Sequence, residues 1–256
     1  MNSSLLAAIV IVGMMLSTWL VSLAIRNASI VDITWGLGFA LVAAVLWVSK
    51  GSSNSLVVLV SLMAIVWGLR LTAYLGWRNI GHGEDFRYRA MRKRWGSRFG
   101  LISLGTVFAF QGLIMWVVSL PVHLVHGSDD PGLGVVALVG VVLWMVGMVF
   151  ETVGDFQLAR FKSDPANEGK VMESGLWRYT RHPNYFGNAC IWWGIAIAAS
   201  TFPDARWGLI GAALMNLLLV RVSGVALLEK SLKRRKPNYE AYIARTSSFI
   251  PRPPRG

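Results

Sequence analysis

The residues best suited to chemistry in this chain stand in one short segment, RYTRHPNYFGN at 178–188. This segment lies directly beside a long apolar run, and a membrane-spanning helix needs only apolar residues. We therefore expect its polar side chains to serve binding or catalysis. The candidates in this segment are Arg178, Tyr179, Arg181, His182, Asn184, Tyr185 and Asn188.

Further candidates are charged or phenolic residues inside or at the ends of apolar runs, where ionisable groups are costly and are candidates for function. They are Arg70, Tyr74, Glu151, Asp155, Arg221 and Glu229. The first two are four residues apart, and so are the next two, so each pair should face one way on a helix. A structural interpretation also exists, in which Arg70 or Arg221 pairs with Glu151 or Asp155 and holds the helices together.

Composition places these residues in a membrane protein. The chain has 256 residues, of which 54% are hydrophobic and 15% are charged, whereas a soluble domain carries about 25% charged residues. Seven stretches lack Asp, Glu, Lys and Arg: 3–25, 33–49, 51–69, 99–128, 131–150, 183–203 and 207–220. The last reaches spanning length only if its helix continues through Arg221 to Leu228.

No segment alternates with a period of two, so strands are not expected. We predict an all-α, polytopic helix bundle with about seven transmembrane helices. We further predict one transmembrane domain over residues 1–256, with the motif-bearing half at about 131–256. The single cysteine, Cys190, offers neither a disulfide nor a cysteine metal site, and we predict no metal site.

The positions of the basic residues predict the orientation in the membrane. Loop 78–98 holds seven lysines and arginines, loop 160–182 five, and the tail from Lys230 eight. The opposite loops hold only Lys50 and Arg206. This asymmetry predicts an outside N-terminus and a cytoplasmic C-terminus in the cell (inner) membrane. The net charge of +12 then reflects contact with membrane lipids, and nucleic acid is not expected as a partner.

The candidate residues lie towards the cytoplasmic side, which suggests a polar cavity open to the cytoplasm. Arginines together with Lys162, Lys170 and His182 suit phosphates. Carboxylates and asparagines suit ribose hydroxyls or a carboxamide. These residues alone indicate a membrane enzyme that binds an anionic, nucleotide-like cofactor and takes an apolar substrate from the bilayer. They leave the cofactor open, and no glycine-rich Rossmann fingerprint is present.

The segment GLWRYTRHPNYFGN, the upstream Glu–Asp pair and the tail NYEAYIARTSSFIP resemble the steroid 5α-reductase superfamily. The similarity is strongest to its bacterial branch, which carries the domain DUF1295. It extends to VDITWGLGF at 31–39, WGLRLTAYLGWRNIGHGEDFRY at 67–88 and ETVGDFQLARFK at 151–162. The shorter motif RHPNYFG is also similar to isoprenylcysteine carboxyl methyltransferases.

This resemblance implies seven transmembrane helices, NADPH bound from the cytoplasmic side, and hydride delivery to an electron-poor carbon–carbon double bond of a lipid such as an enone steroid. It implies that Asp155 and Glu151 face the nicotinamide, and that four cations hold the phosphates: Lys162, Lys170, Arg178 and Arg181. Pocket-lining residues would be Tyr179, His182, Asn184 and Tyr185, with Arg70 and Tyr74 opposite. Asn188 stands where relatives carry an acid.

A hydrogen-bond donor must face the carbonyl oxygen on which enolate charge develops. Tyr74 is the expected donor, and Asp32 and His182 are the alternatives. Five glycines, at 36, 38, 194, 208 and 211, are expected to allow close helix packing. Two other functions stay open: an S-adenosylmethionine-dependent lipid methyltransferase, and a non-catalytic lipid-binding or transport protein.

Overall fold

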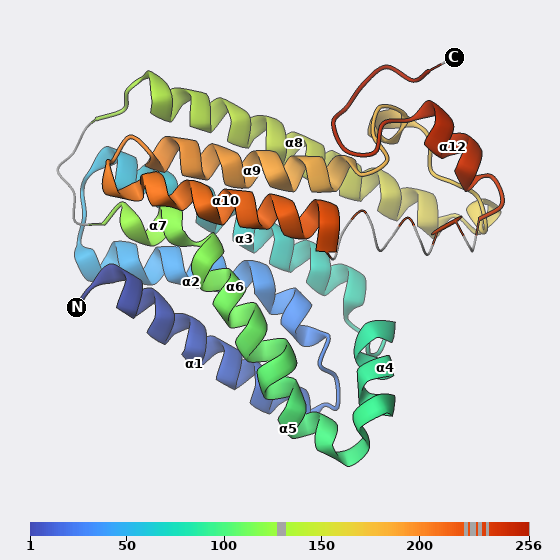
Figure 1. The fold of residues 1–256 in the computed structure, drawn as a ribbon, viewed down its shortest axis with the longest axis horizontal. Coiled ribbons are helices and arrows are strands. Elements are labelled where there is room, and N and C mark those ends of the chain that lie inside the picture. The colour runs from blue at the N-terminus through green and yellow to red at the C-terminus, as the bar shows by residue number, and fades with distance from the viewer. Residues whose placement is uncertain (127–131, 223–224, 226–228, 230–231, 234–235, 256) are drawn as a thin grey trace. The chain divides into compact units, whose positions relative to one another are not determined.

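The computed structural model describes residues 1–126, 132–222, 225, 229, 232–233 and 236–255. Within these residues every regular element is helical, and strand-like pairing is limited to an isolated bridge between Thr180 and Ser247. The predicted all-α class is confirmed (Figure 1).

The chain divides into two compact units. The first comprises Met1–Ala137 and Ile195–Gly211. Its main helices are α1 (Ser3–Ala24), α2 (Ile30–Lys50), α3 (Ser55–Asn79), α4 (Phe86–Trp95), α5 (Phe99–Ser103), α6 (Phe110–Val118) and α7 (Leu120–Leu124). Short helical turns complete it: η1 (Gly96–Arg98), the π-helix η2 (Leu104–Ala109) and η5 (Asp204–Trp207).

The second unit comprises Leu138–Gly194 and Ala212–Gly256. Its elements include most of α8 (Val135–Ser163), most of α9 (Pro183–Ala199), part of α10 (Gly208–Leu217), the π-helix η6 (Leu218–Val222) and α12 (Tyr239–Arg245). The turns η3 (Pro165–Asn167) and η4 (Gly175–Arg178) lie between α8 and α9.

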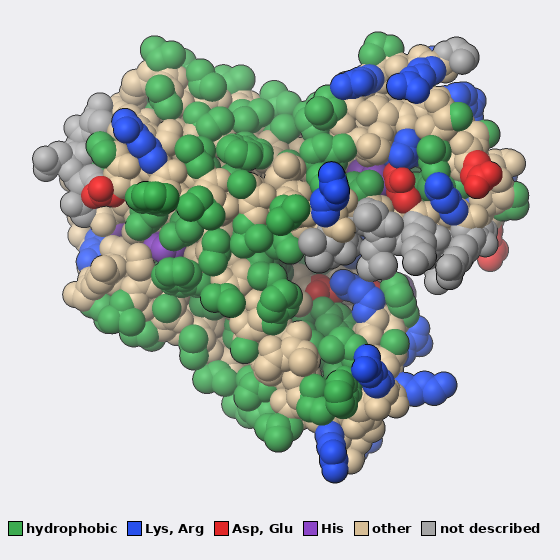
Figure 2. Space-filling model, viewed as in Figure 1, with side chains coloured by type: hydrophobic (Ala, Val, Ile, Leu, Met, Phe, Trp, Pro, Cys, Tyr) green, Lys and Arg blue, Asp and Glu red, His purple; other side chains and the backbone are tan. Residues whose placement is uncertain are grey.

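Five described segments are long and apolar enough to cross a membrane: α1, α2, α3, the run Phe86–Val118 and α8. Large apolar side chains are exposed along α1 and α8, among them Leu5, Ile9, Val142 and Phe156. Hydrophobic side chains cover much of the visible surface (Figure 2). Exposed apolar faces on spanning-length helices need lipid around them, so the chain is a multi-pass membrane protein.

The predicted count of seven spans and the predicted orientation stay predictions. Helix α9 has 17 residues and α10 has 10, and α10 leads through η6 into residues that are only partly described. The proposed continuation to Leu228 therefore lies partly outside the described residues. The single-domain assignment likewise stays a prediction.

Close helix packing in the first unit depends on glycines. A Cβ atom on Gly36 would lie 2.4 Å from the Gly68 carbonyl oxygen, and one on Gly38 would lie 2.4 Å from Met115 Sδ. Helices α2 and α3 therefore cross with their backbones in contact. Added Cβ atoms on Gly208 and Gly211 would also meet backbone atoms at 2.6–2.7 Å. The predicted packing role of these glycines is confirmed.

Candidate functional site

Helices α8 and α9 of the second unit bring acidic and amide side chains together in pairs. Asn184 Nδ2 donates to Asp155 Oδ1 across 3.0 Å, and Asn188 Nδ2 donates to Glu151 Oε1 across 3.4 Å. Both acidic residues are buried, with only 4% of Asp155 and 3% of Glu151 exposed. The four residues form what we call the carboxylate–amide ladder. The prediction that the two carboxylates face in one direction is confirmed.

Glycines in α8 and α9 make this ladder possible. A Cβ atom on Gly147 would lie 2.6 Å from the Gly187 carbonyl oxygen, and one on Gly194 would lie 2.6 Å from the Gly140 carbonyl oxygen. These distances are too short for any side chain, so the two backbones are in close contact. Short polar side chains can then reach across the gap. The predicted role of Gly194 is confirmed.

One hydrogen-bond acceptor of the ladder lacks a donor among the described residues. Asn188 Oδ1 is buried and has no hydrogen-bond partner among the described residues. A buried acceptor without a donor costs about 1–3 kcal/mol. The atom is therefore suited to accept a hydrogen bond from a ligand.

The segment before α9 is held by the C-terminal stretch of the chain. The bridge between Thr180 and Ser247 aligns residues 179–181 with residues 247–252. Three hydrogen bonds join the two stretches: Arg181 N to Ser247 O at 2.9 Å, Thr180 Oγ1 to Phe249 O at 2.8 Å, and Arg252 N to Tyr179 O at 2.9 Å. The RYTRH segment is thus one side of a small two-stranded contact.

Arg181 is buried, and its guanidinium contacts other parts of the protein. Nε and Nη2 each lie 2.8 Å from Glu229 Oε1. Nη1 donates to the carbonyl oxygens of Ile243 and Thr246, which belong to the last turn and the C-cap of α12. A cation at this position satisfies carbonyls that the helix leaves unpaired. Arg181 therefore joins the motif to α12 and to Glu229, and its predicted contact with phosphate stays a prediction.

His182 lies directly before Pro183, the first residue of α9, as expected for a helix start. The imidazole is buried, with Nε2 3.3 Å from Glu229 Oε1. Its ring stacks on Tyr185, with centroids 5.5 Å apart and an interplanar angle of 5°. Glu229 thus contacts two successive residues of the motif.

The electrostatics of Glu229 follow from these contacts. Burial would raise the pKa of its carboxyl, but hydrogen bonds from His182 and Arg181, together with the positive charge of Arg181, lower it to about 2. Glu229 is therefore a carboxylate throughout the physiological pH range.

The other predicted cofactor contacts of this unit are exposed. Lys162 is near the end of α8, Lys170 lies in the following loop, and Arg178 ends η4. Tyr179 is also exposed, as is Arg221 in the π-helix η6. The second unit thus combines a buried ladder with exposed cations.

In the first unit, Tyr74 lies between two arginines on α3. The guanidinium carbons of Arg70 and Arg78 are 5.3 and 5.4 Å from its ring centroid. The predicted common face of Arg70 and Tyr74 is confirmed. The predicted pairing of Arg70 or Arg221 with the carboxylates of α8 stays a prediction.

Asp32, in the first turn of α2, is held by residues of α4. Arg87 Nη2 lies 2.6 Å from Asp32 Oδ2, and the Tyr88 hydroxyl donates to Asp32 Oδ1 across 2.8 Å. Gln111 Nε2 donates to the Tyr88 hydroxyl across 3.3 Å, and Arg87 Nε donates to Asp85 across 2.8 Å. Both oxygens of Asp32 are therefore hydrogen-bonded within the first unit.

Glu84 forms a second ion pair in the same loop. Its carboxylate accepts two hydrogen bonds from Arg92, at 2.8 and 2.9 Å, and one from the backbone nitrogen of Ala28 at 2.8 Å. Burial would raise the pKa of Glu84, but these donors lower it. The contacts fix the turn between α1 and α2 against α4.

A family model described as "Protein of unknown function (DUF1295)" matches residues 18–246. The chain belongs to the DUF1295 family. The chain also has weak homology to the steroid 5α-reductase superfamily. Both findings confirm the resemblance that the sequence motifs indicated.

Relatives of this DUF1295 protein include an uncharacterized protein of Schizosaccharomyces pombe, which is 23% identical over 94% of this chain and 79% of its own length. Human 3-oxo-5-alpha-steroid 4-dehydrogenase 1 is 27% identical over 44% of this chain and 37% of its own length. The mouse enzyme of the same name is 36% identical over 62 residues, or 24% of each chain. The matches thus cover only a minor part of the two dehydrogenases. No solved structure matches the chain.

Sequence reasoning assigned no site residue to the GEDFRY loop of this DUF1295 protein. The structure shows that the loop supplies Glu84, Arg87 and Tyr88, which bind residues of the α1–α2 region. Their signal was the motif itself, in which acidic, basic and phenolic side chains stand close together between two apolar runs.

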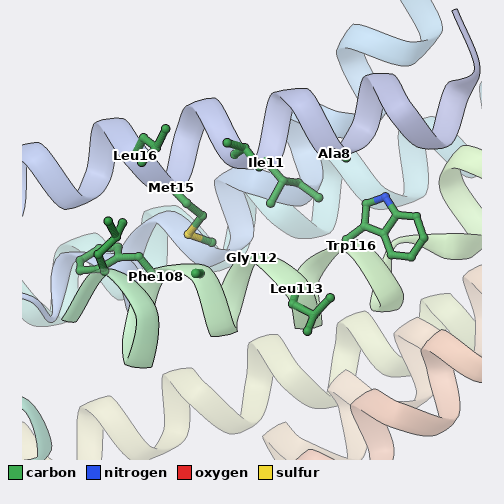
Figure 3. A pocket seen from close by; sticks show the side chains of 11 residues that line it. Ala8, Ile11, Met15, Leu16, Phe108, Gly112, Leu113 and Trp116 are labelled. Atoms are coloured by element: carbon green, nitrogen blue, oxygen red, sulfur yellow. The ribbon is translucent and has the colours of Figure 1, made fainter. Parts of the chain in front are cut away.

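The first unit also holds an apolar pocket of about 350 Å³ between α1, η2 and α6 (Figure 3). Ile11, Met15, Phe108, Leu113 and Trp116 are among the side chains that line it. Its size and lining suit a small apolar ligand or part of a larger one.

Proposed function

We propose that this protein is a membrane-embedded, NADPH-dependent reductase of a carbon–carbon double bond in a lipophilic substrate such as a steroid or an isoprenoid. The observation that carries the proposal is the similarity to human 3-oxo-5-alpha-steroid 4-dehydrogenase 1, which extends over 112 aligned residues, or 44% of this chain. The name of that enzyme describes a redox reaction next to a ketone on an apolar ring system.

The carboxylate–amide ladder supports this proposal. Ribose hydroxyls and a nicotinamide carboxamide carry both donors and acceptors, and the ladder offers carboxylate oxygens, amide groups and the open acceptor Asn188 Oδ1. A buried polar acceptor gains most from a ligand that donates to it. Glu151, Asp155, Asn184 and Asn188 are therefore proposed to hold the nicotinamide end of the cofactor.

The exposed cations suit the phosphates of the same cofactor. Lys162, Lys170 and Arg178 are exposed on the surface of the unit that holds the ladder. Arginine forks and lysine ammonium groups both donate hydrogen bonds to phosphate oxygens. Arg181 is the weakest member of the predicted set, because its guanidinium is engaged with Glu229 and α12.

A bound nicotinamide would supply the hydride, and the protein would have to position the substrate and stabilise charge on its carbonyl oxygen. Tyr74 is the proposed hydrogen-bond donor for that oxygen, and His182 is the first alternative. Asp32, the other predicted alternative, is less suited, because both its oxygens already accept hydrogen bonds. A phenol beside arginines such as Arg70 and Arg78 donates well, because positive charge favours a developing negative charge. The apolar pocket supports a lipophilic substrate that enters from the bilayer.

Purified protein in detergent tests the cofactor directly. We expect NADPH to raise its melting temperature more than NADH or S-adenosylmethionine does at equal concentration. Asp155→Asn should weaken this effect, whereas Glu173→Gln, which removes a charge from an exposed ion pair, should not. Stabilisation by S-adenosylmethionine alone would instead support a methyltransferase, and no response to any of the three would support a non-catalytic protein.

Placement in the cell (inner) membrane, with the C-terminus in the cytoplasm, is part of this proposal because NADPH is a cytoplasmic cofactor. Reporter fusions after Arg98 and Gly256 should show that these positions are cytoplasmic, and a fusion after Asp130 should show that this position is external. A cytoplasmic reading at Asp130 would overturn the seven-span arrangement.

A further inference from the structure

Helix α4 differs from the long helices of the first unit because it is short and basic, and it lies between α3 and the apolar part of the candidate span Phe86–Val118. Its sequence, FRYRAMRKRW, follows α3 by six residues and precedes the apolar run that begins at Phe99. Gly96, with a φ of 55°, ends the helix and separates it from that run. A ten-residue helix in this position must lie close to the membrane surface.

The cations of α4 and the following turn fall into two groups. Arg87 and Arg92 are neutralised inside the protein by Asp32, Asp85 and Glu84. The second group is exposed and consists of Arg89, Lys93, Arg94 and Arg98. Within the described part of the chain, no carboxylate lies within 4 Å of a charged nitrogen of this second group.

Aromatic side chains accompany the exposed cations. Phe86 at the start of α4 and Trp95 at its end are both exposed, and the Arg94 guanidinium lies 5.2 Å from the Trp95 ring centroid. Figure 2 shows lysines and arginines gathered with hydrophobic side chains over this part of the first unit. Aromatic and basic residues together are typical of a helix that lies in the headgroup region.

We infer that α4 is a binding surface for anionic phospholipid headgroups. Guanidinium and ammonium groups donate to the lipid phosphates, while Phe86 and Trp95 insert at the level of the ester groups. The internal pairs of Arg87 and Arg92 hold the helix so that the second group faces the lipid. The inference is independent of the proposed reductase activity.

The test uses full-length protein in dodecyl maltoside, titrated with dioleoyl-phosphatidylglycerol or dioleoyl-phosphatidylcholine. Melting temperature and lipid retained in native mass spectrometry are the two measurements. We expect phosphatidylglycerol to stabilise the protein and to stay bound, and both effects should weaken at high salt. The triple variant R89Q/K93Q/R94Q should bind this lipid at least roughly tenfold more weakly, since each basic residue near an anionic surface contributes about fivefold.

The matched control is K233Q/R252Q/R255Q, which removes the same charge from exposed positions outside α4. It should retain phosphatidylglycerol as well as the natural sequence does. Equal loss in the two triple variants would overturn the inference, because the effect would then reflect net charge. Equal binding of phosphatidylcholine, or equal stabilisation by inorganic phosphate, would also overturn it.

Discussion

The arginine–carboxylate contacts at Asp32 and Glu84 in the first unit differ from the contact at Glu229 in the second unit in how far solvent reaches the arginine. The shortest distances are nearly the same: 2.6 Å from Arg87 to Asp32, 2.8 Å from Arg92 to Glu84, and 2.8 Å from Arg181 to Glu229. The arginine side chains in the first unit are 42% and 36% exposed, however, whereas that of Arg181 is 7% exposed. Solvent screens an exposed pair, while a buried charge depends fully on its partner. Burial rather than distance should therefore decide which contact controls stability.

The largest expected effect comes from Glu229→Gln. The substitution leaves the buried Arg181 without its carboxylate, which should cost on the order of 3 kcal/mol of unfolding free energy. A clearly lower melting temperature in detergent measures this loss. Glu173→Gln, which breaks an exposed pair with Arg245 of the same 2.8 Å length, is the matched control and should change little. Equal losses in the two variants would contradict the role given to burial.

The next effect concerns the carboxylate–amide ladder. Asp155→Asn keeps the size of the side chain and removes its charge, so we expect the fold to remain and NADPH affinity to fall by about 10- to 100-fold, or roughly 1.4–2.8 kcal/mol. Isothermal titration and melting temperature on the same preparation separate binding from stability. A lower melting temperature with unchanged affinity would make Asp155 a purely structural residue.

The buried pair also predicts a dependence on pH. The pKa of Glu229 is lowered to about 2 in the folded protein from an ordinary value of 4.5. The contribution of this carboxylate to the free energy of unfolding is therefore fully present above pH 4.5 and is lost as the pH falls towards 2. The difference in melting temperature between the natural sequence and Glu229→Gln should therefore be constant from pH 7 to pH 5 and shrink below that. A constant difference down to pH 3 would show that the charge of Glu229 does not stabilise the fold.

The smallest effect is expected for Arg87→Gln in the first unit. Arg87 is half exposed, so the loss of its pair with Asp32 should cost under about 1 kcal/mol, and Tyr88 still donates to that carboxylate. High salt should reduce the difference further. A loss as large as that of Glu229→Gln would show that Asp32 and Arg87 are shielded from solvent in the membrane.

Much of this arrangement follows from local sequence. Apolar runs predicted the long helices. A separation of four residues predicted that Arg70 and Tyr74 share one helix face, and that Glu151 and Asp155 share another. Helix α9 begins at Pro183, as is common for a proline at the first position of a helix. These features depend on helical periodicity and on backbone geometry, which a few neighbouring residues determine.

Contacts between distant segments were not predictable in the same way. Nothing in the sequence around Arg181 shows that its guanidinium contacts Glu229 and the end of α12, which lie about 50 and 60 residues later. The Arg87–Asp32 pair likewise joins residues 55 positions apart. An arginine in a polar motif suits a phosphate and a buried carboxylate equally well, and only tertiary structure distinguishes the two.

The contact between residues 179–181 and 247–252 has a consequence for the order of folding. Thr180 and its acceptor Phe249 are 69 residues apart, so this part of the motif cannot close while those later residues are still inside the ribosome. The helices of the first unit up to α7 can insert and pack long before then, because their partners are already synthesised. Closing so long a loop is also slow compared with forming a helical turn. Assembly of the RYTRH segment should therefore be one of the last events in the biogenesis of the protein, and a translational pause near residue 230 should accumulate a membrane-inserted chain in which this segment is open to proteases.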